Sequence, residues 1–280
     1  MRSDRISASI EVSPKQVLDT VNLVGIAPPF TRIYITDVGT ETTDTLVSAA
    51  KKVTDAGYRA VPHFAARRLT TKVALEARIK KMAQEAGVKD SLIIGGGLEK
   101  PNGVFTSTND VIETGFFDLN GIKDIGIAGH PEGSPDFSDE IALEALRLKQ
   151  DLSTRSDANF RIVTQFGFDA DSFIGWAQSI KSSGIDLPIH FGVAGPAKIT
   201  TLIKFAALCG VGSSVAFLKK RPSALIALAA GFEPESIVSP LEKYWLNTQK
   251  TCSVVAQIHV FPFGGLNKSA EWLESRGSWN

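Results

Sequence analysis

The chain has 280 residues, and its 30 lysines and arginines balance its 30 aspartates and glutamates, so the formal net charge is zero. This balance argues against a nucleic-acid binder, because phosphate contacts need an excess of lysine and arginine. With 43% hydrophobic and 21% charged residues, the composition is that of a folded protein and not of a disordered one.

The sequence predicts neither a membrane segment nor a cysteine framework. The first residues lack the apolar stretch of a secretory signal, and no run reaches the ~18 apolar residues of a transmembrane helix. Cys209 and Cys252 lack the spacing of a zinc site, and we interpret both as core thiols. We therefore expect a soluble, cytoplasmic protein that binds neither membranes nor nucleic acid.

Short runs rich in Ile, Val and Phe alternate with longer amphipathic runs along the chain. The short runs predict strands and the amphipathic runs predict helices. In chain order, the predicted strands are 7–13, 32–37, 59–65, 91–95, 124–128, 161–166, 188–192 and 256–262. The predicted helices are 14–23, 43–56, 70–86, 108–117, 138–152, 170–183, 197–209, 223–230, 239–251 and 269–275.

Eight strand–helix units in a chain of this length predict an α/β fold, a (β/α)8 TIM barrel that forms one domain over residues 1–280. An open doubly wound sheet is the alternative, but it has a glycine-rich first turn, and residues 12–16 contain no glycine. The extended helical segment at about 213–253 is longer than one barrel helix requires. We expect it to cover the barrel edge or to form a subunit contact in a homo-oligomer.

Barrels of this kind carry their active sites at the C-terminal ends of the strands. The predicted strands place all four histidines, His63, His130, His190 and His259, at such ends. The histidines therefore predict a polar pocket. A metal site is the alternative, since histidine is a common ligand, but no carboxylate obviously completes a coordination set, and we expect no metal.

Glu11 is the only charged residue of the first predicted strand. A lone carboxylate is costly to bury, and burial is expected to raise its pKa, which suits a general acid. An ion pair with a barrel lysine or arginine is the structural alternative.

Two further features predict ligand contacts. Gln165, in the sixth strand, carries an amide that can pair with a flat heterocycle, although a bond to the next strand is equally compatible. Gly95–Gly97 follow the fourth strand and would let a ligand approach the backbone, although a plain loop explains them equally well.

Several motifs in chain order resemble the methylenetetrahydrofolate reductases, a family of (β/α)8 barrels. Residues 11–14 resemble the family's E-F-F-P-P element, residues 62–66 its P-H-L-T-C, and residues 128–135 its A-x-Y-P-E-x-H-P. Residues 164–169 match T-Q-x-x-F-D, and residues 184–189 resemble G-I-D-x-P-I.

This resemblance implies hydride transfer between NAD(P)H and the methylene/methyl-tetrahydrofolate couple, usually through bound FAD. It implies that Glu11 protonates N10 of the folate and opens the imidazolidine ring to the reactive iminium. Gln165, Phe191 and Gly97 would contact the folate, with Phe191 as a stacking surface for pterin or nicotinamide. The residues that the resemblance implies for cofactor binding are His63, Ala128, His130, Gly95 and Gly96.

Two departures from the family pattern concern the flavin. The family's L-R-G-D-x-P reads Ile94-Gly95-Gly96-Gly97-Leu98-Glu99-Lys100-Pro101 here, so its arginine and aspartate are absent. Its L-K-x-K reads Leu148-Lys149-Gln150-Asp151, so an acid replaces a base near the expected flavin phosphates. Both changes oppose binding of a diphosphate and predict weakened FAD binding, with hydride passing directly from NAD(P)H.

Three alternatives remain open at this stage. A tetrahydrofolate-dependent methyl or one-carbon transferase would use the same barrel and acid, but no nicotinamide. A non-catalytic folate-binding or regulatory barrel would not depend on Glu11 for turnover. A metal-dependent hydrolase would contain a bound metal.

Overall fold

The computed structural model describes residues 5–209, 231–248 and 254–279, and its strands form a closed parallel barrel. The strands follow one another in chain order, and β1 pairs with β8. The predicted (β/α)8 fold is confirmed. The strands are β1 (Ala8–Val12), β2 (Arg32–Ile35), β3 (Arg59–Ala65), β4 (Asp90–Ile94), β5 (Asp124–Gly129), β6 (Asn159–Gly167), β7 (Ile189–Ala194) and β8 (Val255–Phe261).

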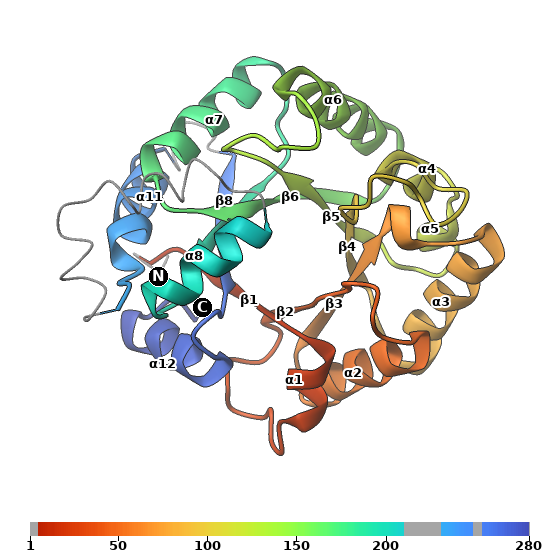
Figure 1. Cartoon of the computed structure of the whole chain (residues 1–280), viewed down its shortest axis with the longest axis horizontal. Coiled ribbons are helices and arrows are strands. Elements are labelled where there is room, and N and C mark those ends of the chain that lie inside the picture. Colours follow the sequence, from red (N-terminus) through yellow and green to blue (C-terminus); the bar gives the residue numbers. More distant parts are fainter. Residues whose placement is uncertain (1–4, 210–230, 249–253, 280) are drawn as a thin grey trace. The chain divides into compact units, whose positions relative to one another are not determined.

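The helices alternate with these strands (Figure 1). The prediction of one helix over 108–117 is wrong, because Gly115 adopts a left-handed φ of 71° and divides the segment in two. The predicted helix 223–230 lies outside the described residues, as does the segment 213–253 except for residues 231–248. The prediction that Cys209 is a core thiol is wrong, because this residue is exposed at the end of α8, and Cys252 lies outside the described residues. The helices are α1 (Pro14–Asp19), α2 (Thr43–Asp55), η1 (Ala66–Arg68), α3 (Lys72–Glu85), α4 (Thr108–Ile112), α5 (Phe116–Leu119), α6 (Asp139–Arg155), α7 (Ala170–Ser182), α8 (Ile199–Leu208), α11 (Glu235–Thr248) and α12 (Leu266–Arg276).

Side-chain caps define where the first helices begin. Ser13 and Gln16 form a capping box at α1, in which the Gln16 backbone N–H donates to Ser13 Oγ and the Ser13 N–H donates to Gln16 Oε1. Such a box satisfies amide groups that the helix itself leaves unpaired. Because the box follows directly after Val12, it ends β1 one residue beyond Glu11.

Two compact units make up the chain. The Glu11 unit comprises residues 11–128 and 148–161, and the Gln165 unit comprises residues 1–10, 129–147 and 162–280. Each unit is described on its own below, and the boundaries of a single domain over 1–280 stay a prediction.

A buried charged cluster holds the N-terminal ends of the strands in the Glu11 unit. Asp90, with no exposed surface, accepts from Arg161 Nη2 at 2.6 Å and from Arg32 Nε at 2.9 Å. Arg161 Nε also donates to the Tyr34 hydroxyl at 2.9 Å. Burial opposes the charge on Arg161, but Tyr34 and Asp90 outweigh it and raise its pKa. Burial likewise raises the pKa of Tyr34. The cluster therefore contains a charged guanidinium, Arg161, and a neutral phenol, Tyr34.

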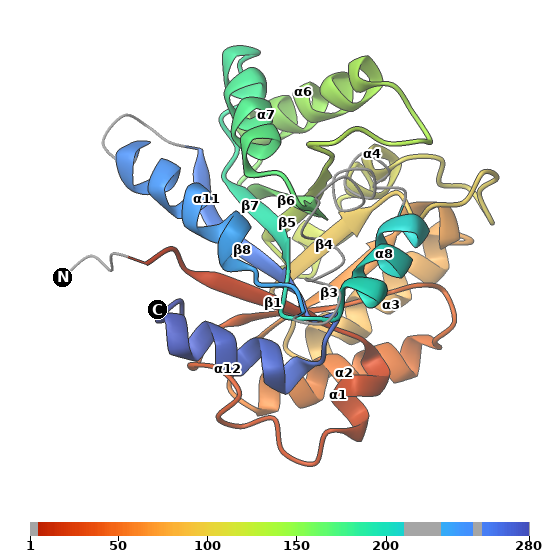
Figure 2. The same ribbon diagram turned by 60° about the vertical axis from the view of Figure 1, so that its left-hand side comes forward.

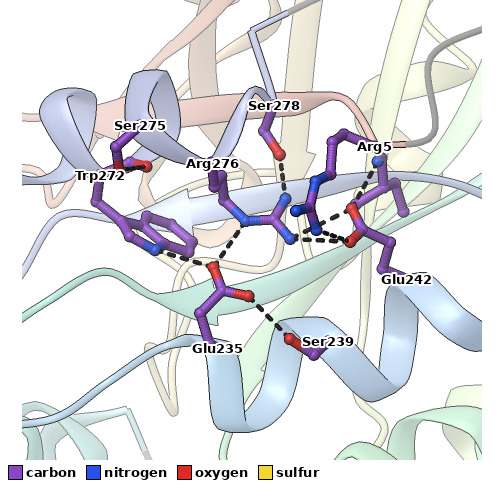
Figure 3. Close-up of polar contacts among 9 residues, drawn as sticks. Arg5, Glu235, Ser239, Glu242, Trp272, Ser275, Arg276 and Ser278 are labelled. Carbon is purple, nitrogen blue, oxygen red and sulfur yellow. Dashed lines mark hydrogen bonds and ion pairs between the residues drawn. The ribbon is translucent and has the colours of Figure 1, made fainter.

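A second ionic cluster ties α11 to α12 in the Gln165 unit, where α11 packs against β8 and α7 (Figure 2). Arg276 Nε lies 2.8 Å from Glu235 Oε1, and Arg276 Nη2 lies 3.2 Å from Glu242 Oε2 (Figure 3). Glu242 also receives Arg5 Nη1 at 2.8 Å, from the segment that precedes β1. Burial opposes ionisation of Glu235, but hydrogen bonds from Arg276 and Ser239 lower its pKa. Glu242 of α11 thus joins three segments, since it contacts both Arg276 of α12 and Arg5.

Within the described ranges, no helix has both the length and the apolar character needed to cross a membrane.

Candidate active site

Glu11 and His63 meet in the Glu11 unit. Glu11 is the fourth residue of β1, and its Oε2 lies 3.5 Å from Nε2 of His63 in β3. The two side chains are 16% and 7% exposed, and the Tyr34 ring contacts the imidazole edge-on, with centroids 6.2 Å apart. The structure thus brings together two of the predicted site residues as an acid beside an imidazole, a pair that can share or exchange a proton.

A buried arginine fixes the backbone of His63. Arg78 of α3 donates from Nη2 to the His63 carbonyl at 2.7 Å and from Nη1 to Asp37 at 2.8 Å. Its guanidinium also lies over the Phe64 ring, 4.6 Å from the centroid. Asp37 accepts a further bond from the Gly39 N–H at 2.9 Å. Arg78 therefore joins the backbone of β3 at His63 to Asp37, which follows β2.

Sequence reasoning missed both Asp37 and Arg78. A signal was present, because Arg78 lies on the apolar face of α3 among the buried residues Leu75, Ile79 and Met82. A charged residue in such a stripe is rarely buried without a partner.

The triglycine loop after β4 rests against η1. The Arg67 N–H donates to the Gly95 carbonyl at 2.9 Å, and Arg68 Nε donates to the Gly96 carbonyl at 2.9 Å. Gly96 has a φ of 99°, and a Cβ there would lie 3.1 Å from Ala65 Cβ, so the position requires glycine. Arg67 and Arg68 therefore lie beside a loop that has no cation of its own. Sequence reasoning missed both arginines, because α3 and β4 separate η1 from the loop along the chain.

Lys149 is the base that remains in the altered L-K-x-K segment. It lies on α6 with 5% of its surface exposed, and burial lowers its pKa to about 8. Ala128, another predicted cofactor contact, lies in β5 and is partly exposed. A buried ammonium group is less accessible to a diphosphate than an exposed one.

Gln165 lies in a bulge of β6, in the Gln165 unit. The register between β6 and β7 shifts between Val163 and Phe166, and Gln165 Oε1 accepts from the Phe166 N–H at 3.1 Å. Side chains along a strand normally alternate between its two faces, and a bulge interrupts this alternation. The bulge here affects the Gln165 amide, which is partly exposed.

Gly192 of β7 makes room for this bulge. A Cβ at Gly192 would overlap the Thr164 carbonyl oxygen and would lie 2.8 Å from the Gln165 carbonyl oxygen. The Gly192 N–H donates to Thr164 Oγ1 at 2.8 Å. Sequence reasoning missed Gly192, since the need for a glycine arises from the backbone of the neighbouring strand β6, which the sequence does not reveal.

The substitution Gly192→Ala is therefore expected to force β6 away from β7. We expect it to cost about 1–3 kcal/mol of unfolding free energy, because backbone atoms and not flexible side chains occupy the space. The measurement is urea unfolding followed by circular dichroism. Gly175→Ala is the matched control: a Cβ there meets nothing within 4 Å, so α7 should be unchanged or slightly stabilised. Equal stability of the two variants would contradict this account of the bulge.

The other predicted residues of the Gln165 unit are more scattered. Phe191 lies within β7 and is fully buried, with its ring edge-on to Phe173 of α7 at 5.1 Å. That packing favours a structural role, and ligand stacking by Phe191 stays a prediction. His130 directly follows β5, and its ring lies 5.0 Å from that of Phe137.

The expectation that all four histidines lie at C-terminal strand ends is wrong for His190. It is the second residue of β7 and lies at the N-terminal end of that strand. His259 is buried in β8, with Nδ1 3.0 Å from Ser9 Oγ. Among residues 5–209, 231–248 and 254–279, no group of three or more His, Cys, Asp or Glu side chains is placed to hold a metal ion.

Comparison with known proteins gives a family match over most of the chain. The profile of the methylenetetrahydrofolate reductase family matches residues 9–222. Methylenetetrahydrofolate reductase 1 of Schizosaccharomyces pombe is 31% identical over 138 residues, which cover 47% of this chain and 22% of that protein. Methylenetetrahydrofolate reductase 2 of Saccharomyces cerevisiae is 35% identical over 82 residues, 29% of this chain and 13% of that protein.

A bacterial relative aligns over a longer stretch. The 5,10-methylenetetrahydrofolate reductase of Pectobacterium carotovorum subsp. carotovorum is 26% identical over 223 residues, 74% of this chain and 70% of that protein. The matches to the two yeast relatives, in contrast, span less than a quarter of their length.

Proposed function

The chain belongs to the methylenetetrahydrofolate reductase family, and from this membership we propose that it transfers hydride between NAD(P)H and the methylene/methyl-tetrahydrofolate couple. The observation that carries the proposal is the contact between Glu11 of β1 and His63 of β3, whose Oε2 and Nε2 atoms lie 3.5 Å apart. An acid in such a half-buried position can protonate a substrate nitrogen, the step that activates a methylene bridge.

Glu11 acts first in the proposed mechanism. Its proton passes to N10 of 5,10-methylenetetrahydrofolate, and the bond between N10 and the methylene carbon breaks. The remaining N5 iminium accepts a hydride, with its two electrons, from NAD(P)H and becomes the N5 methyl group, while the nicotinamide is oxidised. His63 stabilises the carboxylate that Glu11 becomes, and Arg78 holds the His63 backbone in place. Solvent returns the proton, and in the reverse direction the carboxylate accepts it from N10.

We propose that this transfer proceeds without FAD, because the residues present fit a flavin diphosphate poorly. The loop Gly95–Gly97 carries no charged side chain of its own, and Arg67 and Arg68 beside it already donate to the carbonyls of Glu99 and Gly96. Lys149 is buried, with a pKa lowered to about 8. These features support direct transfer from nicotinamide to folate.

The test is to record the visible spectrum of the purified protein and then to add NADH and methylenetetrahydrofolate. We expect NADH absorbance to fall in a protein that shows no flavin band. A flavin band that NADH bleaches would contradict direct transfer and would indicate that Arg67 and Arg68 serve FAD after all. Folate turnover without any oxidation of NADH would contradict the reductase and would favour a one-carbon transferase.

A further inference from the structure

Three phenylalanine rings form a near-parallel stack in the Gln165 unit. Phe263, which follows β8, stacks on Phe205 of α8 with centroids 4.4 Å apart and planes at 19°. Its other neighbour is Phe261, the last residue of β8, at 5.7 Å and 21°. All three rings are partly exposed. We call Phe205, Phe261 and Phe263 the aromatic stack.

The backbone holds this stack in one arrangement. The Phe263 N–H donates to the Phe261 carbonyl at 2.9 Å, which closes a tight turn around Pro262. The Gly195 N–H, at the end of β7, donates to the same Phe261 carbonyl at 2.9 Å. A Cβ at Gly264 would overlap the Pro196 carbonyl, so the following loop also lies tightly against its neighbour. The rings are therefore fixed before any ligand arrives.

Phe166 of β6 closes one edge of the stack. Its ring contacts Phe263 at 4.8 Å and 69°, and Phe261 at 5.4 Å and 56°. Phe166 directly follows Gln165, whose amide is the predicted pterin contact. The bulge in β6 thus places a hydrogen-bonding amide next to the residue that supports the stack.

We propose that Phe261 extends the stack to a ligand and receives the flat pyrimidine half of the pterin ring of tetrahydrofolate. Phe261 lies at the C-terminal end of a barrel strand, where ligands of this fold bind, whereas Phe205 lies on the helix α8. Stacking on an aromatic face is favourable for any planar heterocycle. The amide of Gln165, the residue before Phe166 in β6, favours the pterin, which presents donors and acceptors along its edge. This inference rests on the proposed function, since it names the ring of the proposed substrate.

The test measures binding without turnover, by calorimetry. One arm titrates 5-methyltetrahydrofolate alone into the protein, and the other titrates NADH alone. We expect Phe261→Leu to bind the folate roughly 5- to 150-fold more weakly than the parent protein, because leucine fills space but offers no aromatic face. Phe261→Tyr keeps that face and should bind within about twofold of the parent protein. NADH binding should be unchanged in both variants.

One control and four outcomes decide the matter. Phe116→Leu, which truncates a partly buried ring of α5 outside the stack, should leave folate affinity unchanged. Folate binding to Phe261→Leu equal to that of the parent would overturn the inference alone, as would equal losses in the Leu and Tyr variants. A loss of NADH affinity only would assign the stack to nicotinamide and overturn the pterin assignment. A parent protein that binds neither ligand would overturn the proposed function, and this inference with it.

Discussion

Replacing Glu11 by glutamine is expected to lower the rate of NADH oxidation by methylenetetrahydrofolate roughly 10²–10⁴-fold. Glutamine has nearly the same shape as glutamic acid and can still contact His63, but it has no acidic proton to give to N10. The bridge between N5 and N10 would then stay closed, and hydride would have no iminium to attack. The KM for the folate should change little, because the lost interaction belongs to the transition state.

Single-turnover kinetics with the purified variant measure this effect directly. Glu85→Gln is the matched control, since it makes the same chemical change on an exposed position of α3 in the same unit. The control should turn over at the parent rate. If Glu11→Gln also kept the parent rate, the acid role would be wrong, and a binding or regulatory barrel would account better for the chain.

The substitution Arg161→Met is expected to have the largest effect on stability, about 3–5 kcal/mol of unfolding free energy. Asp90 has no exposed surface, and without Arg161 its charge would face only Arg32, whose side chain is 27% exposed. The Tyr34 hydroxyl would lose the hydrogen bond from Arg161 in the same step. Removing one member of a buried pair leaves an uncompensated charge, which costs more than the pair contributes as a whole.

Urea unfolding of Arg161→Met, Asp90→Leu and the double variant tests this account. The double variant should be less destabilised than the sum of the single variants, because the one charge that loses its partner, on Arg32, is 27% exposed to solvent. Lys123→Met, which breaks the exposed pair between Lys123 and Asp157, is the control and should leave the unfolding midpoint nearly unchanged. Additive effects of the two buried substitutions would contradict a coupled cluster.

The fold could be predicted from the sequence because helix caps and strand patterns depend on residues that are close together in the chain. The caps at Ser13 and Thr42 mark where α1 and α2 begin, and the predicted strand 59–65 coincides with β3. The prediction of one helix over 108–117 was wrong because the chain changes direction at Gly115. The apolar spacing continues across the break, whereas a single left-handed residue ends the helix.

The candidate site was less predictable, because its parts meet only in three dimensions. Glu11 could be identified as a lone carboxylate, but the sequence does not show that His63 would be its neighbour. Arg68 reaches the triglycine loop across 28 positions, and Arg78 reaches Asp37 across 41. Gly192 serves a bulge in a different strand. Such contacts depend on strand register, which composition and periodicity do not specify.

The pairing of β1 with β8 has a consequence for how the chain is made. Ser9 Oγ bonds the Ile258 carbonyl across 249 positions, and Ala8 is aligned with Ile258 in the ladder. During synthesis, the first strand therefore leaves the ribosome long before its partner exists. At translation rates of ~5–20 residues per second, one edge of the nascent sheet stays open for on the order of ten seconds or more. Closure of the barrel is thus a late event. Until then, β1 presents an unpaired strand edge that a chaperone could bind.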